Sequence, residues 1–349
     1  MTAPWDYADF DDHEGVHLFR DADAGLTAVI AVHSTALGPA AGGTRFWHYG
    51  DRSEAITDAL RLSRGMSYKN AMAGLPMGGG KAVILADAKR TKTPAMLDAF
   101  GAAVESLNGR YVTAEDVGMS DADMVAIQAR TRHVSGLPVG EGRAGGDPGP
   151  YTALGIYLGV KAAIRRALGK DSAAGVHVAI QGVGSVGGGL ARLLAADGAK
   201  LTLADMDRAR AETLAAELGA KTVAASEILR VEADVVSPCA LGAILDASAI
   251  DALRTPIVAG GANNQLATPS DGNRLHARGI LYAPDYVINA GGIINVGLEY
   301  LGQGDKAEVE SRIHRIPGRL EEIWTESAAT GAPAATVADR MAQRLIGRG

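Results

Sequence analysis

Residues Val176–Leu194 read VHVAIQGVGSVGGGLARLL, and the expected fold follows from this stretch. Val176–Ile180 is mostly apolar, which is typical of a buried strand, and a helix is expected after it. Between strand and helix, Gly182, Gly184 and Gly187 match the spacing G-x-G-x-x-G, which is informative only when it joins two such elements. The stretch therefore predicts the strand–turn–helix that opens a dinucleotide-binding domain.

Each part of the turn suits a dinucleotide. Gly182 permits the tight turn, Gly184 lets the backbone approach a pyrophosphate, and Gly187 lets the helix lie close to the strand. The helix N-terminus offers free N–H groups to phosphates. Asp205 ends the next expected strand, Lys200–Ala204, where a carboxylate binds ribose hydroxyls and repels a 2′-phosphate, which favours NAD over NADP. The alternative is a glycine-rich turn without a ligand, and the position of Asp205 argues against it.

The cofactor site should extend along neighbouring strand ends, because ligands in such sheets bind outside the carboxyl ends of the strands. Further strands are expected at Asp234–Ser237, Ile257–Ala259 and Ile280–Tyr282. Cys239 follows the first of them, but no histidine follows it at a triad-like spacing, so we interpret it as a packing residue rather than a nucleophile. The predicted cofactor-binding residues on these strand ends are Gly182, Val183, Gly184, Ser185, Val186, Gly187, Asp205, Cys239, Ala240, Gly261 and Asn263.

The whole chain is predicted to be an α/β protein of two domains. Residues 141–320 alternate strands with helices, which is typical of a parallel, doubly wound Rossmann sheet, and residues 1–140 form a separate α/β domain for substrate binding and oligomerisation. Gly136–Pro150, with six glycines and three prolines, is the expected hinge. Helices in residues 321–349 are expected to pack back on the first domain.

In the first domain, the pattern predicts a strand at Gly25–His33, whose exposed edge would suit a dimer contact. A glycine-rich loop is expected at Ala36–Arg45. Helical spacing runs over Ser53–Met66, with the serine as the cap. Gly74–Gly80 interrupts the pattern before a strand at Ala82–Leu85.

Composition and charge limit the possible functions. Hydrophobic residues make up 47% of the chain and charged residues 21%, so we expect folded cores rather than disorder. The net charge is −6 without a cluster of Lys and Arg, so neither nucleic acid nor membrane is an expected partner. One cysteine, no signal peptide and no apolar run of membrane-spanning length predict a cytoplasmic protein. No metal site is expected.

Three charged residues of the first domain are candidates for chemistry. Lys81 follows three glycines and precedes an apolar strand, so burial should lower its pKa and let it act as a base; a solubilising surface lysine is the alternative. Lys69 stands near the end of a helix. Asp116 follows a short strand at Tyr111–Thr113 and enters a loop from which a carboxylate can reach a cleft, although a helix cap or turn would also account for it.

Five further motifs occur in order along the chain. They are Gly38–Arg45 (GPAAGGTR), Tyr68–Asn70 (YKN), Leu75–Lys81 (LPMGGGK), Thr113–Gly118 (TAEDVG) and Asn289–Gly292 (NAGG). With these motifs, residues 15–345 resemble the glutamate/leucine/phenylalanine/valine dehydrogenase family. The resemblance implies a homo-oligomer that performs the reversible, NAD-dependent oxidative deamination of an L-amino acid to a 2-oxo acid and ammonia.

The resemblance also implies residue roles. Lys69 would bind the substrate carboxylate, Lys81 would activate the water that attacks an imine, and Asp116 would exchange protons with the amino group and the departing nitrogen. Closure of the two domains around the hinge would expel water and align the substrate with the nicotinamide. Residues expected at the nicotinamide are Thr152, Asn263 and Asn289.

The resemblance further implies an apolar substrate side chain. The family's glutamate enzymes have a lysine and a serine where this chain has Ala41 and Val296, neither of which can pair with a carboxylate. Ala114 and Val296 favour leucine or valine, whereas Leu275–Asp285 resembles the phenylalanine branch, so phenylalanine is the alternative. The predicted substrate-binding residues are Lys69, Gly42, Gly43, Ala41, Met66, Ala114, Asn263, Asn289, Ile293 and Val296.

Two other classes of protein are possible. A catalytically silent NAD-binding sensor would keep the fold, but the presence of Lys69, Lys81 and Asp116 together argues against it. A hydroxy-acid dehydrogenase would need a catalytic histidine with a carboxylate partner, and none of the eight histidines has a comparable glycine-rich or strand-end setting. The expected function is therefore that of an NAD-dependent amino-acid dehydrogenase.

Overall fold

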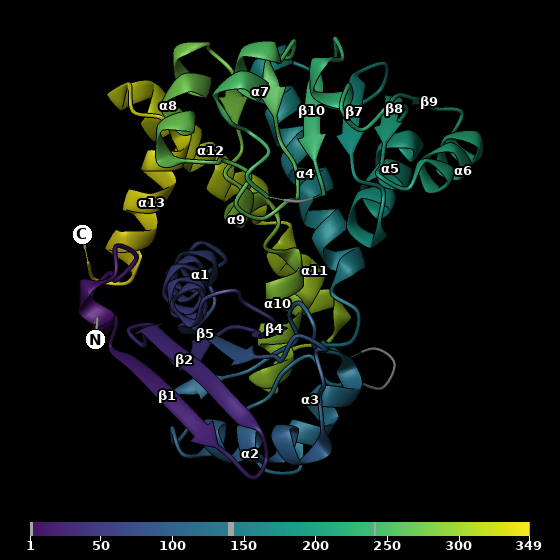
Figure 1. Cartoon of the computed structure of the whole chain (residues 1–349). Helices are drawn as coiled ribbons and strands as arrows, with labels where there is room; N and C mark the ends of the chain where they lie inside the picture. Colours follow the sequence, from purple (N-terminus) through teal and green to yellow (C-terminus); the bar gives the residue numbers. More distant parts are fainter. Residues whose placement is uncertain (1–2, 139–142, 241, 349) are drawn as a thin grey trace. The chain divides into compact units, whose positions relative to one another are not determined.

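The computed structural model describes residues 3–138, 143–240 and 242–348, and the chain divides into two compact units (Figure 1). The first unit comprises residues 1–147, 293–309 and 342–349, and the second comprises residues 148–292 and 310–341. The units differ from the predicted ranges 1–140, 141–320 and 321–349, whose first boundary lies outside the described residues. Within the described ranges, no helix has both the length and the apolarity that a bilayer span requires.

A six-stranded sheet forms the centre of the first unit, in the order β1-β2-β5-β3-β6, with β4 also paired to β5. Helix α1 (Arg52–Met72) covers one face, and α2 (Pro94–Glu105) and α3 (Asp121–Gln128) lie on the other (Figure 1). The strands are β1 (Gly15–Asp21), β2 (Leu26–Ser34), β3 (Ala40–Ala41), β4 (Thr44–Trp47), β5 (Gly78–Leu85) and β6 (Tyr111–Val112). The predicted strand at Gly25–His33 is confirmed as β2, but β2 pairs with both β1 and β5, so the exposed edge belongs to β1 instead.

Two glycine-rich segments that were predicted as interruptions contain strands. The expected loop at Ala36–Arg45 includes β3 and the start of β4, and Gly74–Gly80 includes the start of β5. Packing explains the difference: a Cβ on Gly79 would lie 2.0 Å from the backbone nitrogen of Ser67 in α1. Glycine in this strand therefore permits close contact between sheet and helix rather than a turn.

Helix α1 is longer than predicted and has a different cap. It begins at Arg52, and the side chain of Asp51 accepts the N–H of Ser53, so Asp51 rather than Ser53 is the N-cap. It continues past Met66 to Met72, because residues in its last two turns are buried against the sheet.

The second unit contains a parallel sheet in the order β12-β11-β10-β7-β8-β9. Its strands are β7 (His177–Gln181), β8 (Lys200–Ala204), β9 (Lys221–Thr222), β10 (Val235–Pro238), β11 (Ile257–Val258) and β12 (Leu281–Tyr282). Counted from β7, the spatial order is 3-2-1-4-5-6, which is that of a doubly wound Rossmann fold. The predicted fold class is confirmed, and the switch in strand order falls between β7 and β10.

Helices cover both faces of this sheet, with α4 and α5 packed together on one face. On the other face, α7 and α8 share a core with Ala179 and Val236. The helices of the second unit begin with α4 (Gly149–Leu168), α5 (Ser185–Ala196), α6 (Arg208–Leu218), α7 (Ala247–Ala252), α8 (Pro269–Ala277) and α9 (Asp285–Ile288). The remaining elements of the chain are α10 (Gly291–Tyr300), α11 (Lys306–Ile313), α12 (Ile316–Thr330), α13 (Ala334–Leu345) and the 3₁₀ helices η1 (Pro4–Asp6) and η2 (Ile228–Arg230).

The later helices are divided between the units differently from the prediction. Most of α10 belongs to the first unit, where a Cβ on Gly297 would contact Leu75 and Met77 at 3.2 and 3.3 Å. Helix α12 belongs to the second unit, because Trp324 is buried there and its indole N–H donates to the carbonyl of Tyr282 at 2.8 Å. Only residues 342–349 of the predicted C-terminal segment pack with the first unit.

The expected hinge, Gly136–Pro150, is only partly free of regular structure. Residues 139–142 lie outside the described residues, and Gly149 and Pro150 begin α4. Near the start of the segment, the Glu299 carboxylate accepts the N–H of Gly136 at 2.8 Å. Further along, the Asn295 amide pairs with both backbone groups of Gly145, at 2.8 and 2.9 Å. Helix α10 therefore holds described parts of this segment in the first unit.

A buried histidine anchors the end of the chain in the first unit. The Arg348 guanidinium donates to the carbonyl oxygens of Asp11, Asp12 and His33 and to His33 Nε2, at 2.6 to 2.8 Å. His33 Nε2 also lies 3.0 Å from Asp11 Oδ2, and His33 Nδ1 lies 2.7 Å from Ser67 Oγ. Burial and the charge of Arg348 lower the pKa of His33 to about 4.

The first prediction concerns stability in acid. The pKa of His33 is about 4 when folded, below its ordinary value of 6.5, so the unfolded chain binds this proton more readily. The stabilisation from neutral His33 is complete above about pH 6.5 and is lost as the pH falls towards 4. We expect it to amount to about 3 kcal/mol, measured as the free energy of unfolding against pH. His33→Gln should flatten this decline, and an unchanged slope in the variant would contradict the assignment.

Candidate functional site

Strand alternation places Lys81 on the face of the first unit's sheet that α1 covers. Successive residues of β5 point to opposite faces. Gly79 contacts α1, and Val83 packs with apolar residues of α1, whereas Ala82 and Ile84 belong to the core on the other face. Lys81 lies between the first two and is only 7% exposed. The alternative interpretation, a surface lysine, is therefore wrong.

Lys81 forms a close ion pair with Asp116. Its Nζ lies 2.6 Å from Asp116 Oδ2, and Asp116 stands in the loop after β6. Burial lowers the pKa of Lys81, and the neighbouring carboxylate only partly opposes this effect. Burial acts most strongly and would raise the pKa of Asp116, but the charge of Lys81, its hydrogen bond to the carboxylate and the charge of Arg45 together lower this pKa. The pair thus combines an ionised carboxylate with an amine that releases its proton more easily than a free lysine.

Gly43 allows the loop of Asp116 to approach the sheet. A Cβ on Gly43 would lie 2.3 Å from the carbonyl oxygen of Glu115 and 3.0 Å from Asp116 Cβ. A Cβ on the preceding Gly42 would lie 1.9 Å from the carbonyl oxygen of Gly80. These two glycines therefore serve to bring β5 and the Asp116 loop together.

The predicted substrate residues of the first unit fall into three groups by their contacts. Met66 lies beside Gly42, 3.0 Å from the position of its Cβ, and Lys69 follows three residues later on the same side of α1. Ala41 and Ile293 share an apolar cluster whose buried members also include Leu75, Met77 and Val112. Val296 is half-buried, three residues beyond Ile293 in α10, and the carbonyl of Ala114 accepts the N–H of Thr44 at 2.8 Å.

Sequence analysis did not single out Arg45, which also contacts the pair. Its Nε lies 3.3 Å from Asp116 Oδ2, and its Nη1 lies 2.7 Å from Asp58 Oδ2. In β4, buried Thr44 and Phe46 alternate with half-buried Arg45 and Trp47. If the sequence had been recognised as a strand here, its alternation would have placed Arg45 on the less buried face of β4, together with Trp47.

The turn after β7 forms a cradle at the carboxyl end of the second unit's sheet. Gly182 has φ +85°, and a Cβ there would lie 2.8 Å from Ala240 Cβ. A Cβ on Gly187 would lie 1.9 Å from the carbonyl oxygen of Gly182, so helix and turn are in direct contact. Gly184 is the N-cap of α5, no side chain caps this helix, and no atom would lie within 4 Å of its Cβ. The exposed start of α5, with Ser185 and Val186, therefore has room for an anion beside free N–H groups.

Asp205 lies at the end of β8 and holds the turn in place. Its Oδ2 accepts the N–H of Val183 at 2.8 Å, and its Oδ1 accepts the N–H of Asp207 at 2.9 Å. Burial acts to raise the pKa of Asp205, but these bonds and the charge of Arg210 lower it. A carboxylate at this point suits ribose hydroxyls and repels a phosphate.

The strand ends next to the switch point carry the remaining predicted residues. Cys239 donates its N–H to the carbonyl of Gln181 at 2.7 Å, and burial raises the pKa of its thiol, as expected of a packing residue. Asn289 Nδ2 donates to Asn263 Oδ1 at 2.7 Å and to the carbonyl of Gly261 at 3.1 Å. Asn289 Oδ1 is buried and accepts no hydrogen bond from the described residues.

Thr152 lies in the first turn of α4, where its hydroxyl donates to the carbonyl of Pro148 at 2.9 Å. A Cβ on Gly292 would lie 2.6 Å from Thr152 Oγ1. The structure therefore places Thr152 beside the turn that begins at Asn289. The described part of the chain contains no group of three His, Cys, Asp or Glu side chains able to hold a metal ion.

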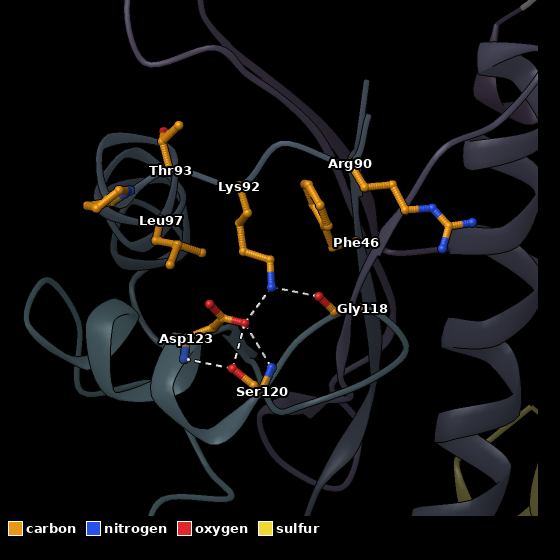
Figure 2. Close-up of a pocket in the computed structure, with 9 residues that line it drawn as sticks. Phe46, Arg90, Lys92, Thr93, Leu97, Gly118, Ser120 and Asp123 are labelled. Carbon is orange, nitrogen blue, oxygen red and sulfur yellow. Dashed lines mark hydrogen bonds and ion pairs between the residues drawn. The ribbon is translucent and has the colours of Figure 1, made fainter. Parts of the chain in front are cut away.

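A cavity of about 600 Å³ lies elsewhere in the first unit and contains none of the predicted site residues (Figure 2). Lys92 Nζ donates there to Asp123 Oδ2 at 2.5 Å and to the carbonyl of Gly118 at 2.6 Å. Asp123 also accepts from the backbone and hydroxyl of Ser120, as part of the cap of α3. This second Lys–Asp pair belongs to a helix cap, which makes it a useful control for the pair of Lys81 and Asp116.

The second prediction tests the close approach at Gly43. Gly43→Ala should lower the free energy of unfolding by about 2 kcal/mol, because its Cβ would overlap the Asp116 loop. Gly65→Ala is the matched control, since Gly65 is exposed in α1 and has open space around its Cβ. We expect the control to be neutral or stabilising by up to about 1 kcal/mol. Equal thermal unfolding of the two variants by calorimetry would refute the packing argument.

Comparison with known proteins identifies the family. Residues 13–133 match the dimerisation domain of Glu/Leu/Phe/Val dehydrogenases, and residues 202–344 match the Glutamate/Leucine/Phenylalanine/Valine dehydrogenase family. The chain is 46% identical to a leucine dehydrogenase of Geobacillus stearothermophilus over 97% of this chain and 92% of the relative. It is 43% identical to a valine dehydrogenase of Streptomyces virginiae over 97% and 95%.

A solved structure agrees with these sequence matches. The crystal structure of L-tryptophan dehydrogenase from Nostoc punctiforme superposes with a TM-score of 0.85 and 40% identity, covering 96% of each chain. The sequence matches and this structure cover both units described above. The chain therefore belongs to the glutamate/leucine/phenylalanine/valine dehydrogenase family and is an oxidoreductase of the amino-acid dehydrogenase class.

Proposed function

We propose that the protein catalyses the reversible oxidative deamination of an apolar L-amino acid with NAD, and that it prefers leucine and valine. The observation that carries this proposal is the buried pair of Lys81 and Asp116, with 2.6 Å between Nζ and Oδ2. A lysine whose pKa is lowered and an ionised carboxylate can exchange protons near neutral pH.

The reaction consumes water and releases ammonia, so protons must move at two places. NAD, when bound, would supply the acceptor for the hydride on the substrate Cα. Asp116 would accept a proton from the amino group as the substrate becomes an imine, and Lys81 would remove a proton from the attacking water. Asp116 would then return a proton to the departing nitrogen, and the hydroxyl left by the water would lose its remaining proton to solvent, which gives ammonia and the 2-oxo acid. Lys69 is assigned to hold the substrate carboxylate, as a fixed cation at the end of α1.

The chemistry of the second unit's cradle fits NAD. The uncapped start of α5 suits the pyrophosphate, and the Asp205 carboxylate suits an adenosine ribose that carries two free hydroxyls. Asn289 Oδ1 is buried and has no hydrogen-bond partner among the described residues, so it can accept a hydrogen bond from the nicotinamide amide. Asn263 contacts the Asn289 side chain, and Thr152 lies beside Gly292. These residues would hold the cofactor.

The preference for an apolar side chain rests on the residues near Lys81. Ala41 and Ile293 belong to an apolar cluster, and Val296 lies on the same helix as Ile293. A carboxylate on the substrate's side chain, as in glutamate, would have no ion-pair partner among these residues, and burying it would be costly. The leucine and valine dehydrogenases among the relatives support an aliphatic substrate. The small side chain of Ala41 and the tryptophan dehydrogenase relative favour an aromatic one such as phenylalanine as the second candidate.

We also propose that the protein forms a homo-oligomer. Its first unit matches a dimerisation domain, and the edge strand β1 exposes Leu18 to 65%. A cytoplasmic location stays a prediction from the sequence.

The third prediction is a substrate preference. With NAD, kcat/KM should be highest for leucine, valine and isoleucine, lower for phenylalanine and tryptophan, and lowest for glutamate. A difference of one methylene in an apolar pocket changes kcat/KM by about 10- to 200-fold at most, so graded values are expected among the apolar substrates. NADH formation at alkaline pH is the measurement. If the enzyme turns over none of the apolar amino acids, the proposed activity is contradicted. The catalytically silent NAD-binding sensor is then the better interpretation.

Variants of the pair supply the control for this assay. Lys81→Ala and Asp116→Asn should each lower kcat on the order of a hundredfold to ten-thousandfold, because each removes a proton-transfer group. Lys92→Ala removes the lysine of the Lys92–Asp123 pair and should leave kcat unchanged. A loss of activity in all three variants would point to general destabilisation rather than to catalysis.

The fourth prediction concerns cofactor choice. Asp205→Ser removes the carboxylate that repels a 2′-phosphate, so the ratio of kcat/KM with NADP to that with NAD should rise about tenfold or more. Glu217→Gln removes one exposed negative charge from α6 and should leave the ratio unchanged. An equal ratio in the wild type and Asp205→Ser would argue against the assigned role of Asp205.

A further inference from the structure

We propose that Arg45 is a positioning residue for proton transfer: its guanidinium joins Asp116 to Asp58 and thereby holds the Asp116 carboxylate against the Lys81 amine. This inference rests on the proposed function, because it assigns Arg45 to the same pair. It adds a third charged group, from a different strand, to a site in which Lys81 and Asp116 act on the substrate.

The contacts form a row of alternating charges. Lys81 Nζ lies 2.6 Å from Asp116 Oδ2, and Arg45 Nε lies 3.3 Å from the same oxygen. On its other side, Arg45 Nη1 lies 2.7 Å from Asp58 Oδ2 in α1. One carboxylate oxygen is therefore shared by two cations, and its direction depends on both of them.

Asp58 is itself held from two sides, so it gives Arg45 a fixed support. The Tyr49 hydroxyl donates to Asp58 Oδ2 at 2.8 Å, and Arg61 Nη2 lies 3.1 Å from Asp58 Oδ1. The Arg45 and Asp58 side chains are 22% and 18% exposed, so solvent screens this support less than it would a surface pair. The planar guanidinium presents separate nitrogens to the two carboxylates, which the single ammonium group of a lysine cannot do in the same geometry.

Arg45 also affects which group carries the proton. Its charge lowers the pKa of both Lys81 and Asp116, whereas Asp58 acts in the opposite direction on Lys81. Near the row, Tyr49 and Tyr111 have raised pKa values, so they stay protonated. Arg61 contacts Asp58, and burial and Asp121 raise the pKa of Glu115, next to Asp116 in the chain, to about 7. An arginine does not lose its proton in proteins. Lys81 is therefore the member of the row that can become a neutral base.

If Arg45 had a purely structural role, it would make the same contacts, so the test must separate a structural role from an electrostatic one. Loss of a purely structural contact lowers activity equally at every pH. An electrostatic and positioning role also moves the pH dependence: without the positive charge of Arg45, protonated Lys81 is more stable and its pKa rises. The acid limb of the pH–rate profile should then shift to higher pH, while activity at the alkaline plateau is better retained.

The experiment measures kcat/KM for leucine against pH with saturating NAD in the full-length enzyme. For Arg45→Met we expect the acid limb to move upward by about half to one pH unit. Arg45→Lys keeps the positive charge but loses the guanidinium group that reaches both carboxylates. The acid limb of its pH–rate profile should therefore stay nearer the wild-type position, while its kcat falls. Arg61→Gln is the matched control, because it removes the other arginine bound to Asp58. Among the described residues Arg61 contacts Asp58 and not Asp116, so the acid limb of this variant should not move.

Two results would overturn the proposal. They are a uniform loss of activity without a shift in Arg45→Met, and a shift of equal size in Arg61→Gln. If Arg45→Met does not fold, as judged by circular dichroism and thermal unfolding, Arg45→Gln replaces it and the same two results apply. The failure of the proposed function gives a different pattern: Lys81→Ala then keeps its turnover. If Lys81→Ala is inactive and the Arg45 variants show no shift, only the role of Arg45 is refuted.

Discussion

The burial of a positive charge is the constraint around which the candidate site is organised. Lys81 lies within β5, where its neighbours along the strand are small or apolar, and an isolated ammonium group there would be costly. The Asp116 carboxylate offsets this cost, and Arg45 and Asp58 extend the pair into a row of four alternating charges. Because these side chains are buried or half-buried, the charge on each one is felt by its neighbours more strongly than in water.

Glycines make this arrangement, and that of the cofactor cradle, sterically possible. At Gly43 and Gly79, a side chain would overlap the Asp116 loop and helix α1, respectively. In the second unit, a side chain on Gly187 would overlap the turn at Gly182. In all three cases the missing Cβ allows two backbones to meet. At Gly182 itself the backbone also has a left-handed φ, which favours glycine. The proton transfer proposed for the first unit and the phosphate binding proposed for the second thus depend on the same property of one residue type.

Much of the second unit could be predicted because its signals are local. Strand Lys200–Ala204 has the predicted bounds, and the G-x-G-x-x-G turn joins β7 to α5 as expected. Apolar runs, helical spacing and the start of a helix after a glycine turn are all visible within a few residues. The ordered motifs also identified the family, as the comparisons confirm, and singled out Lys81 and Asp116 before their contact was known.

Local patterns alone did not reveal which charges meet, nor which glycines belong to strands. Arg45 is 13 residues from Asp58 and 71 from Asp116, so nothing in the periodicity around it indicates either partner. The runs at Ala36–Arg45 and Gly74–Gly80 carry the local signal of a loop, yet both enter the sheet because other backbones pack against them. The sequence was sufficient for elements, the cofactor turn and the family, since these depend on neighbours in the chain. The row of charges and the division into units depend on contacts between distant segments, which exist only once the chain has folded.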